Sequence, residues 1–409
     1  MEIRPILSTL RRHKTAAALL ALEVALTCAI VCNALFLIGQ RIEAVGKPSG
    51  IDEDRVLEVR VNGIGSDANT YAITNEDLAA LRAIPGVEHA SAINHLPFRR
   101  RGSWNTSLSL TREQEIPTLN AAQYMGTEDL VETLGLRIAK GRDFTPDEYV
   151  DFARIGNEID PTKATFPVLV TRAVADKLYP DGSTLGRTVY MGSTGLRVVG
   201  IVESLARPNT FQGPLTQQYS IILPVRLSYG EGFYAVRAKD PSRRKEILGA
   251  VVAALDKVAP NRLHDGQVTY EETRREYFQD DRAMAWLLVV VCVALLVVTA
   301  LGIVGLASFW VQQRTKQIGV RRALGATRGQ ILRYFQVENF LIAGIGIVLG
   351  MLLAYGLNQL LMGTYELPRL PLWYLPVGAV VLWLLGQAAV YGPARRAASV
   401  PPAVATRSV

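Results

Sequence analysis

Residues 283–311 read AMAWLLVVVCVALLVVTALGIVGLASFWV, a run of 29 residues without a charged side chain. A bilayer core about 30 Å thick needs roughly 20 apolar residues in a helix, so this stretch is long enough to cross it. Three further windows are similar: residues 16–38, interrupted only by Glu23, then 339–362 and 372–391. A helix facing water would need one polar side, which these windows lack. The sequence therefore predicts four transmembrane helices.

Basic residues are distributed unevenly around the four windows. Residues 1–15, 312–337 and 392–409 together hold thirteen Lys and Arg but a single acidic residue, Glu2. By the positive-inside rule, these segments and both chain termini are predicted to lie on the cytoplasmic side of the membrane. Residues 40–282 hold 30 basic and 33 acidic residues and are predicted to be periplasmic. The net charge of +7 thus follows from membrane topology and does not indicate nucleic-acid binding.

The windows divide the chain into predicted segments. The periplasmic segment alternates short β-rich runs with short helical patterns, which is typical of an α+β domain. Residues 124–223, approximately, are richer in β-branched residues and turn signals than their flanks, so we interpret them as a smaller, β-rich lobe inserted into a larger one. The full order is N-terminus and first span (1–39), periplasmic domain (40–282), second span (283–311), cytoplasmic loop (312–338), third span (339–362), fourth span (372–391) and cytoplasmic tail (392–409).

Motifs of enzymes are missing from the sequence. It contains no G-x-x-x-x-G-K-[ST], no G-x-S-x-G and no H-E-x-x-H. Its four His are scattered, and its three Cys (Cys28, Cys32 and Cys292) lie in apolar runs, so neither a catalytic group nor a metal site can be drawn. We therefore expect a chain that is not an enzyme and binds no cofactor or metal of its own.

Glu23 is the ionisable residue that lies well inside a predicted span. A carboxyl group within a membrane costs on the order of 2.5 to 3.5 kcal/mol unless it is paired or hydrated, which makes it a functional candidate. Two roles stay open. Glu23 either faces other helices or the headgroup zone as a structural residue, or it contributes to conformational coupling.

The return from the periplasmic domain to the membrane has a helical pattern. Residues 269–272, Thr-Tyr-Glu-Glu, form a capping-box pattern, and no Pro or Gly occurs between Tyr270 and Leu301. This predicts one unbroken helix from Tyr270 to Val311, roughly 60 Å long, that could carry displacement across the membrane. A kink at the membrane surface near residues 280–282 is the alternative.

Residues 314–332 form the most informative stretch, RTKQIGVRRALGATRGQIL. Ile318, Arg321, Arg322 and Gly325 fall on one face of a short helix, with Gly325 suited to end it. Thr327 and Gln330 form a capping pattern for the next helix. The pattern predicts a short basic helix at the membrane surface. The alternative is that this helix only anchors the chain to lipid headgroups.

Small residues recur every fourth position in two spans. They are Ala21, Ala25 and Ala29 in the first span, and Gly346, Gly350 and Ala354 in the third. Such rows let helices approach closely. The sequence leaves open whether they meet within one chain, between two chains, or face lipid.

Residues 317–327, QIGVRRALGAT, resemble the (E)IGxRRAxGAT loop of the MacB/FtsX-like (type VII) permeases of ABC transporters, with Gln317 where Glu is more usual. Shorter matches occur in the same order as in that family. They are LGLRIAKGRDF at 134–144, LGRTV at 185–189 with VVGIV at 198–202, and PARRAA at 393–398. Together these matches span most of the chain.

The resemblance implies a fold, partners and a function. The fold is an α-helical membrane protein with four transmembrane helices plus an α+β periplasmic domain, in which a β-rich lobe is inserted into a porter-like lobe. The implied location is the bacterial inner membrane, with both termini in the cytoplasm. Its partners are an ABC ATPase subunit that carries ATP and Mg²⁺, a second permease copy or paralogue in a dimer, and in some systems a periplasmic adaptor. ATP hydrolysis then reshapes the periplasmic domain by mechanotransmission for export. A regulatory scaffold that activates an envelope hydrolase and a lipoprotein-release permease are the alternatives.

The resemblance also assigns docking residues in the 312–338 loop. Ile318, Arg321, Arg322 and Leu324 would seat in the ATPase. The complete set predicted for docking is Gln317, Ile318, Gly319, Arg321, Arg322, Leu324 and Gly325.

Overall fold

The computed structural model describes residues 14–62, 70–99, 104–209, 216–227, 231–260, 262–365 and 369–401. The chain folds as two compact units. Residues Met1–Val45 and Asp280–Val409 form the first, and residues Gly46–Gln279 form the second.

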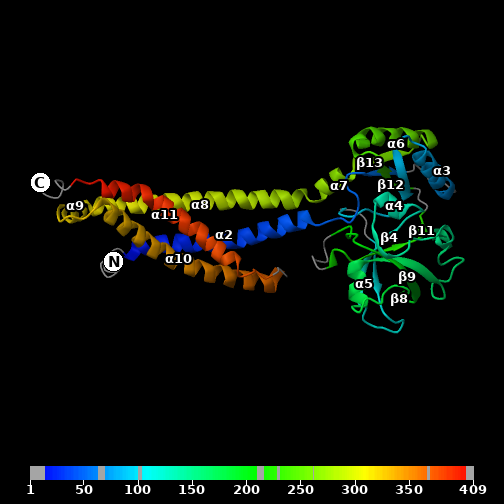
Figure 1. The fold of residues 1–409 in the computed structure, drawn as a ribbon, viewed down its shortest axis with the longest axis horizontal. Coiled ribbons are helices and arrows are strands. Elements are labelled where there is room, and N and C mark those ends of the chain that lie inside the picture. The colour runs from blue at the N-terminus through cyan, green and yellow to red at the C-terminus, as the bar shows by residue number, and fades with distance from the viewer. Residues whose placement is uncertain are drawn as a thin grey trace. The chain divides into compact units, whose positions relative to one another are not determined.

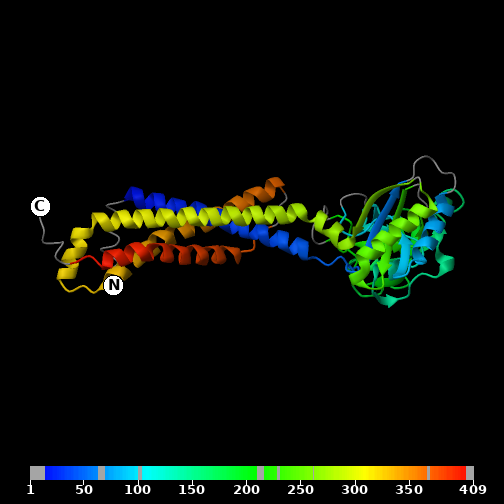
Figure 2. The ribbon, with the colours of Figure 1, turned by 90° about the horizontal axis from the view of Figure 1, so that it is seen from above.

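Long apolar helices form the first unit (Figure 1). Four of them are long and apolar enough to cross a membrane, and each overlaps one predicted window, so the prediction of a four-helix membrane region is confirmed. A fifth, short helix lies at the turn between the second and the third long helix (Figure 2). Within the described residues, the helices of this unit are α2 (Lys14–Gly46), α8 (Gln279–Gln313), α9 (Thr315–Ala323), α10 (Arg328–Tyr365) and α11 (Tyr374–Ala398).

The two rows of small residues meet inside this unit. A Cβ atom on Gly346 would lie 2.6 Å from the carbonyl oxygen of Ala21, and one on Gly350 would lie 2.4 Å from the Cβ of Cys28. Further along, Asn33 Nδ2 donates a hydrogen bond of 3.2 Å to the carbonyl of Ala354. Packing within one chain therefore occupies both rows, which decides between the alternatives that the sequence left open.

A four-stranded antiparallel sheet forms one layer of the second unit. Its strand order is β13-β1-β12-β2, and apolar side chains of α3 and α6 pack against it around Leu57, Val236 and Val251. The elements of this lobe are β1 (Val56–Asn62), α3 (Thr70–Arg82), β2 (Val87–Ala92), β12 (Glu231–Ala238), α6 (Arg244–Val258), β13 (Leu263–Thr269) and α7 (Tyr270–Tyr277).

A seven-stranded mixed sheet forms the other layer, and all its strands lie in the chain between β2 and β12. Its path is β3-β4-β10-β7-β9-β5, with β8 on β9, and α5 packs against it. The predicted inserted lobe of about 124–223 overlaps this sheet, whose first strand begins earlier, at Asn105. The strands β6 (Val150–Asp151) and β11 (Val225–Arg226) pair with each other in a separate two-stranded sheet. The other elements between β2 and β12 are β3 (Asn105–Leu108), β4 (Leu119–Met125), α4 (Leu130–Leu134), β5 (Ile138–Gly141), β7 (Thr165–Thr171), α5 (Arg172–Leu178), β8 (Thr188–Met191), β9 (Thr194–Val202) and β10 (Ser220–Leu223).

The prediction of an unbroken helix from Tyr270 to Val311 is wrong. The capping box at Thr269 and Glu272 is present and begins α7, but this helix ends at Tyr277, and α8 begins at Gln279. Phe278 separates them. Its side chain is fully buried, with its ring centroid 5.0 Å from that of Phe98. The helix is therefore interrupted at a buried aromatic residue, where the sequence has neither Pro nor Gly, and the break lies two residues before the alternative kink near residues 280–282.

Candidate functional site

Local backbone chemistry fixes the ends of α9. Gly325 has φ of +95°, and its N–H donates to the carbonyl of Arg322, while the N–H of Ala326 donates to that of Arg321. This pair of bonds is a Schellman motif, and it favours glycine at this position. Thr327 and Gln330 exchange backbone-to-side-chain hydrogen bonds of 2.9 and 3.3 Å at the start of α10. The predicted helix end and capping pattern are both confirmed.

One side of α9 packs against the chain itself. Ile318 is only 5% exposed and contacts a cluster that includes Phe335 of α10 and Ala394 of α11. Gly319 beside it is also buried. Arg322 Nη1 donates to the carbonyls of Ala398 and Val400, at 2.6 and 3.3 Å. These contacts use Ile318, Gly319 and Arg322 to hold α9 on α10 and α11.

The other side of α9 is open. Gln317, Val320, Arg321 and Leu324 are exposed and follow the spacing i, i+3, i+4, i+7, so they form one face, which we call the outer face. Leu324 is 83% exposed and Val320 is 49% exposed. The guanidinium of Arg321 lies 5.0 Å from the ring centroid of Tyr334, which orients it. Val320 was not in the predicted docking set, although its spacing from Gln317 indicates the same face.

A buried ion pair that the sequence analysis did not predict joins the start of α9 to α10. Arg314 Nη1 lies 2.9 and 2.8 Å from the two carboxylate oxygens of Glu338 in α10. The two side chains are 9% and 2% exposed. Glu338 falls one residue before the predicted third span, and Arg314 shortly after the second. Opposite charges at the facing ends of consecutive apolar runs were the available signal.

Glu23 faces α8 within the membrane unit. Its carboxylate lies against Gly302, where a Cβ atom would be 2.6 Å from an oxygen of Glu23. One turn away, the hydroxyls of Thr27 and Thr299 form a buried hydrogen bond of 2.8 Å. Glu23 therefore belongs to a polar seam between α2 and α8, and its role in coupling stays a prediction.

In the second unit, buried polar contacts hold α7 on the sheet. Thr273 Oγ1 donates to Glu58 Oε2 at 3.1 Å, and Glu58 also pairs with Arg99 at 2.8 Å. Burial raises the pKa of Glu58 above its ordinary value. Arg274 pairs with Glu53 and donates to the carbonyl of Lys47. We call this set, with Thr273 and Arg274 as its α7 members, the α7 clamp.

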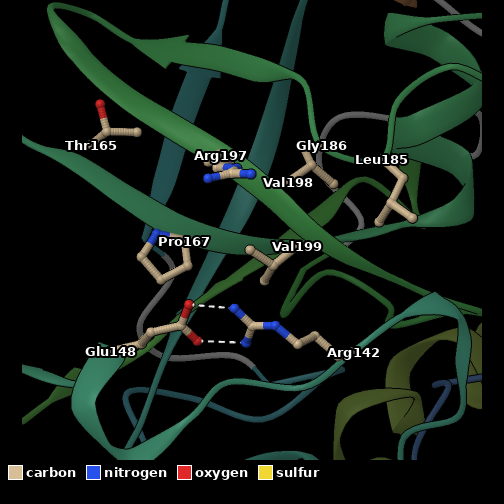
Figure 3. Close-up of a pocket in the computed structure, with 9 residues that line it drawn as sticks. All are labelled: Arg142, Glu148, Thr165, Pro167, Leu185, Gly186, Arg197, Val198 and Val199. Atoms are coloured by element: carbon tan, nitrogen blue, oxygen red, sulfur yellow. Dashed lines mark hydrogen bonds and ion pairs between the residues drawn. The ribbon is translucent and has the colours of Figure 1, made fainter.

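A hollow of about 540 Å³ opens on the seven-stranded sheet (Figure 3). Arg142 and Glu148 close one side through two hydrogen bonds of 2.7 and 2.6 Å, and Arg197 lies over the strands together with Pro167 and Val199 (Figure 3). The hydrogen bonds from Arg142 lower the pKa of Glu148 to about 2. Two arginines, of which Arg142 is paired with Glu148, therefore line this hollow together with apolar side chains.

Asp143, next to this pair, gives a pH-dependent prediction. Burial raises its pKa to about 6, so the folded state binds a proton more tightly than the unfolded state does. Stability from this group is therefore present at about pH 4 and is lost as pH rises through about 6. We expect Asp143→Asn to raise the free energy of unfolding at pH 7.5 by about 1 kcal/mol, a value already reduced because the side chain is partly exposed. This change corresponds to a rise of about 2–4 °C in the melting temperature.

Thermal unfolding of the full chain at pH 4 and pH 7.5 measures this effect. Asp147→Asn is the matched control, since Asp147 is exposed four residues away. A stabilisation by Asp143→Asn of equal size at both pH values would rule out the titration as its cause.

Among the described residues, no three His, Cys, Asp or Glu side chains lie close enough together to hold a metal ion. Of the four His, only His89 and His95 have described side chains. His95 is fully buried, its ring centroid 4.4 Å from that of Tyr124, and burial lowers its pKa to about 3. The expectation that this chain binds no cofactor or metal stays a prediction.

Comparison with known proteins gives matches over both units. Residues 17–254 match the model of the MacB-like periplasmic core domain, and residues 289–402 match that of the FtsX-like permease C-terminal region. The uncharacterized ABC transporter permease YknZ of Bacillus subtilis is 23% identical over 99% of this chain and 98% of its own length. The macrolide export ATP-binding/permease protein MacB of Chromobacterium violaceum is 27% identical over 69% of this chain, which spans 43% of MacB. The periplasmic region of MacB from Actinobacillus actinomycetemcomitans aligns with 57% of the chain, at 13% identity and a TM-score of 0.35.

Proposed function

Because this chain belongs to the MacB/FtsX-like (type VII) family of ABC transporter permeases, we propose that it is the membrane subunit of an export system powered by a separate ATP-binding subunit. That subunit carries ATP and Mg²⁺ and docks on the outer face of α9. The permease works as a dimer with a second copy or a paralogue in a bacterial inner membrane, with both termini in the cytoplasm. A periplasmic adaptor is a further proposed partner, for which the hollow beside Arg197 offers a surface.

The exposed outer face of α9 carries this proposal. Leu324 and Val320 are large apolar side chains exposed on the tip of a helix whose opposite side is fixed to α10 and α11. Central apolar side chains with a cation beside them are typical of protein docking sites. The docking residues are therefore Gln317, Arg321 and Leu324 of the predicted set, together with Val320. Ile318, Gly319 and Arg322 support α9 from beneath, and Gly325 ends it.

A route for displacement runs along consecutive elements. α9 follows α8 after one residue, Arg314, and α8 follows α7 after one residue, Phe278. The α7 clamp fixes α7 to strand β1 through Thr273 and Glu58. Movement of α9 on ATP binding thus has a short covalent path to the second unit, and no step requires substrate to pass between the helices.

Purification of the chain from its native membranes tests the proposal. We expect an ATP-binding subunit to co-purify and its ATP hydrolysis to support export from proteoliposomes. A chain that brings no ATP-binding subunit would contradict the proposal. Hydrolysis that proceeds without export of any tested solute, but activates an envelope hydrolase, would favour the regulatory scaffold instead.

The α7 clamp gives a prediction that separates docking from coupling. Arg274→Met removes the ion pair with Glu53 and the hydrogen bond to Lys47, both partly buried. We expect export to fall about tenfold while the ATP-binding subunit still co-purifies, since a coupling free energy of 1 to 3 kcal/mol is typical. Transport per ATP hydrolysed is the measurement.

The neighbouring residue is the control for this variant. Arg275 is 63% exposed and pairs only with Glu271 among the described contacts, at 2.9 Å along the helix surface. Exposed pairs of this kind contribute about 0.3–0.5 kcal/mol. Arg275→Met is therefore expected to leave export within a factor of about two, and equal losses in both variants would argue against the clamp.

A further inference from the structure

We propose that the buried pair of Arg314 and Glu338 is a positioning device that sets the register of α9 on α10. Neither residue belongs to the outer face, and neither was assigned by the sequence motifs. The inference deepens the proposed function and rests on it, because the register of α9 decides how a push from a docked subunit enters α8 and α10.

The location of Arg314 is the first argument. It is the single residue between the end of α8 at Gln313 and the start of α9 at Thr315, with φ of −102° and ψ of 10°. The chain turns at this residue. A side chain anchored here fixes the direction in which α9 leaves α8.

The geometry of the pair is the second argument. Arg314 Nη1 contacts both oxygens of the Glu338 carboxylate, at 2.9 and 2.8 Å, and its guanidinium carbon lies 5.6 Å from the ring centroid of Trp310 in α8. The guanidinium of Arg314 thus contacts both a side chain at the end of α8 and a buried side chain of α10. Trp310 is itself buried, so the guanidinium has little freedom to move.

The energetics of buried charges supply the third argument. A buried ion pair is weak evidence for stability, because apolar side chains of similar volume often replace it without loss. Setting a register is the best-attested use of such groups. Apolar contacts are non-directional, whereas charge-assisted hydrogen bonds have a defined geometry. Ile318 and its neighbours bury α9, whereas the Arg314–Glu338 pair adds a directional contact to α10, as the hydrogen bonds from Arg322 do to the end of α11.

The experiment measures the position of α9 directly in the full chain. Spin labels are placed on the exposed residues Lys316 in α9 and Arg395 in α11, with the three native cysteines replaced by alanine. We expect a narrow distance distribution in the otherwise native chain. Arg314→Met with Glu338→Leu, which keeps the site filled, is expected to broaden it, and the exchanged pair Arg314→Glu with Glu338→Arg is expected to narrow it again. Arg328→Met, on an exposed residue of α10, is the control and should leave the width unchanged.

Two results would overturn the proposal. One is an unchanged distribution in the apolar double variant. The other is an exchanged pair that inserts and folds as well as the native chain but stays as broad as the apolar variant. A merely structural role predicts the first result, since the apolar variant retains packing.

A second readout connects the register to the proposed function. In the complex with the co-purified ATP-binding subunit, the apolar double variant is expected to retain binding but to lose about tenfold in transport per ATP, with recovery in the exchanged pair. Full transport in the apolar variant would count against the inference. The distance measurement needs no ATP-binding subunit, so a native chain that binds none would overturn the proposed function while the spin labels still tested the pair.

Discussion

Leu324→Asp is expected to release the ATP-binding subunit from the purified complex. Leu324 is 83% exposed at the tip of α9, with Arg321 and Val320 beside it on the outer face. An apolar anchor at the centre of an interface commonly contributes 2 kcal/mol or more, and aspartate would bring an unpaired charge into the same contact. We expect affinity to fall by about 100-fold, measured by titrating the ATP-binding subunit onto the permease in nanodiscs.

A matched variant on the same helix checks that docking, and not folding, is lost. Ala323→Asp adds the same charge one residue earlier, outside the outer face, and is expected to weaken binding at least tenfold less. Arg321→Glu should weaken docking as well, whereas Arg322→Glu acts by breaking the bonds to Ala398 and Val400. Undiminished binding by Leu324→Asp would remove the outer face from the proposed interface.

Gly350→Leu is expected to prevent assembly of the membrane unit. At this position α10 touches α2, and a Cβ atom would lie 2.4 Å from the Cβ of Cys28 and 2.6 Å from the carbonyl oxygen of Ala25. Neither a helix backbone nor a Cβ atom can move aside cheaply. Overpacking of this kind costs about 1–3 kcal/mol or more, so we expect most of the protein to be lost from the membrane fraction or to run as aggregate on size exclusion.

Gly356 in the same helix provides the control. A Cβ atom there would meet nothing within 4 Å, so Gly356→Leu should insert and elute like the native chain. Equal behaviour of the two variants would show that close contact between α2 and α10 does not hold the bundle together.

Apolar length was the strongest signal in the sequence. Four apolar windows of about 20 residues predicted four membrane helices, because helices of soluble proteins do not need uncharged apolar runs of that length. The loop helix was predicted as well, since Gly325 and the Thr327–Gln330 pattern act through the local backbone. What the sequence did not reveal was which side of α9 faces the chain. Ile318 and Leu324 are both apolar, and only the fold decides that Ile318 is buried while Leu324 is exposed.

Contacts between residues far apart in the sequence account for the remaining differences between the predicted and the observed structure. α7 ends before Phe278, whose ring packs near Phe98, 180 residues earlier in the chain, and no local sequence pattern indicates such a contact. Glu338 lies one residue outside an apolar window, so the sequence pattern did not pair it with Arg314, which was counted among the basic residues of the cytoplasmic loop. The rows of small residues were visible, but their partner helix became known only from the packing of Gly346 on Ala21.

Transfer of motion from α8 to α7 is the central claim, and one distance tests it most directly. Spin labels on Glu276 in α7 and Leu301 in α8, both exposed, lie on opposite sides of the break at Phe278. The distance is measured in the complex with the ATP-binding subunit, first with ADP and then with ATP and vanadate. We expect export driven through α8 to change the angle between α8 and α7 at Phe278, which predicts two different distance distributions. A single distribution in both nucleotide states, with the ATP-binding subunit bound, would contradict it.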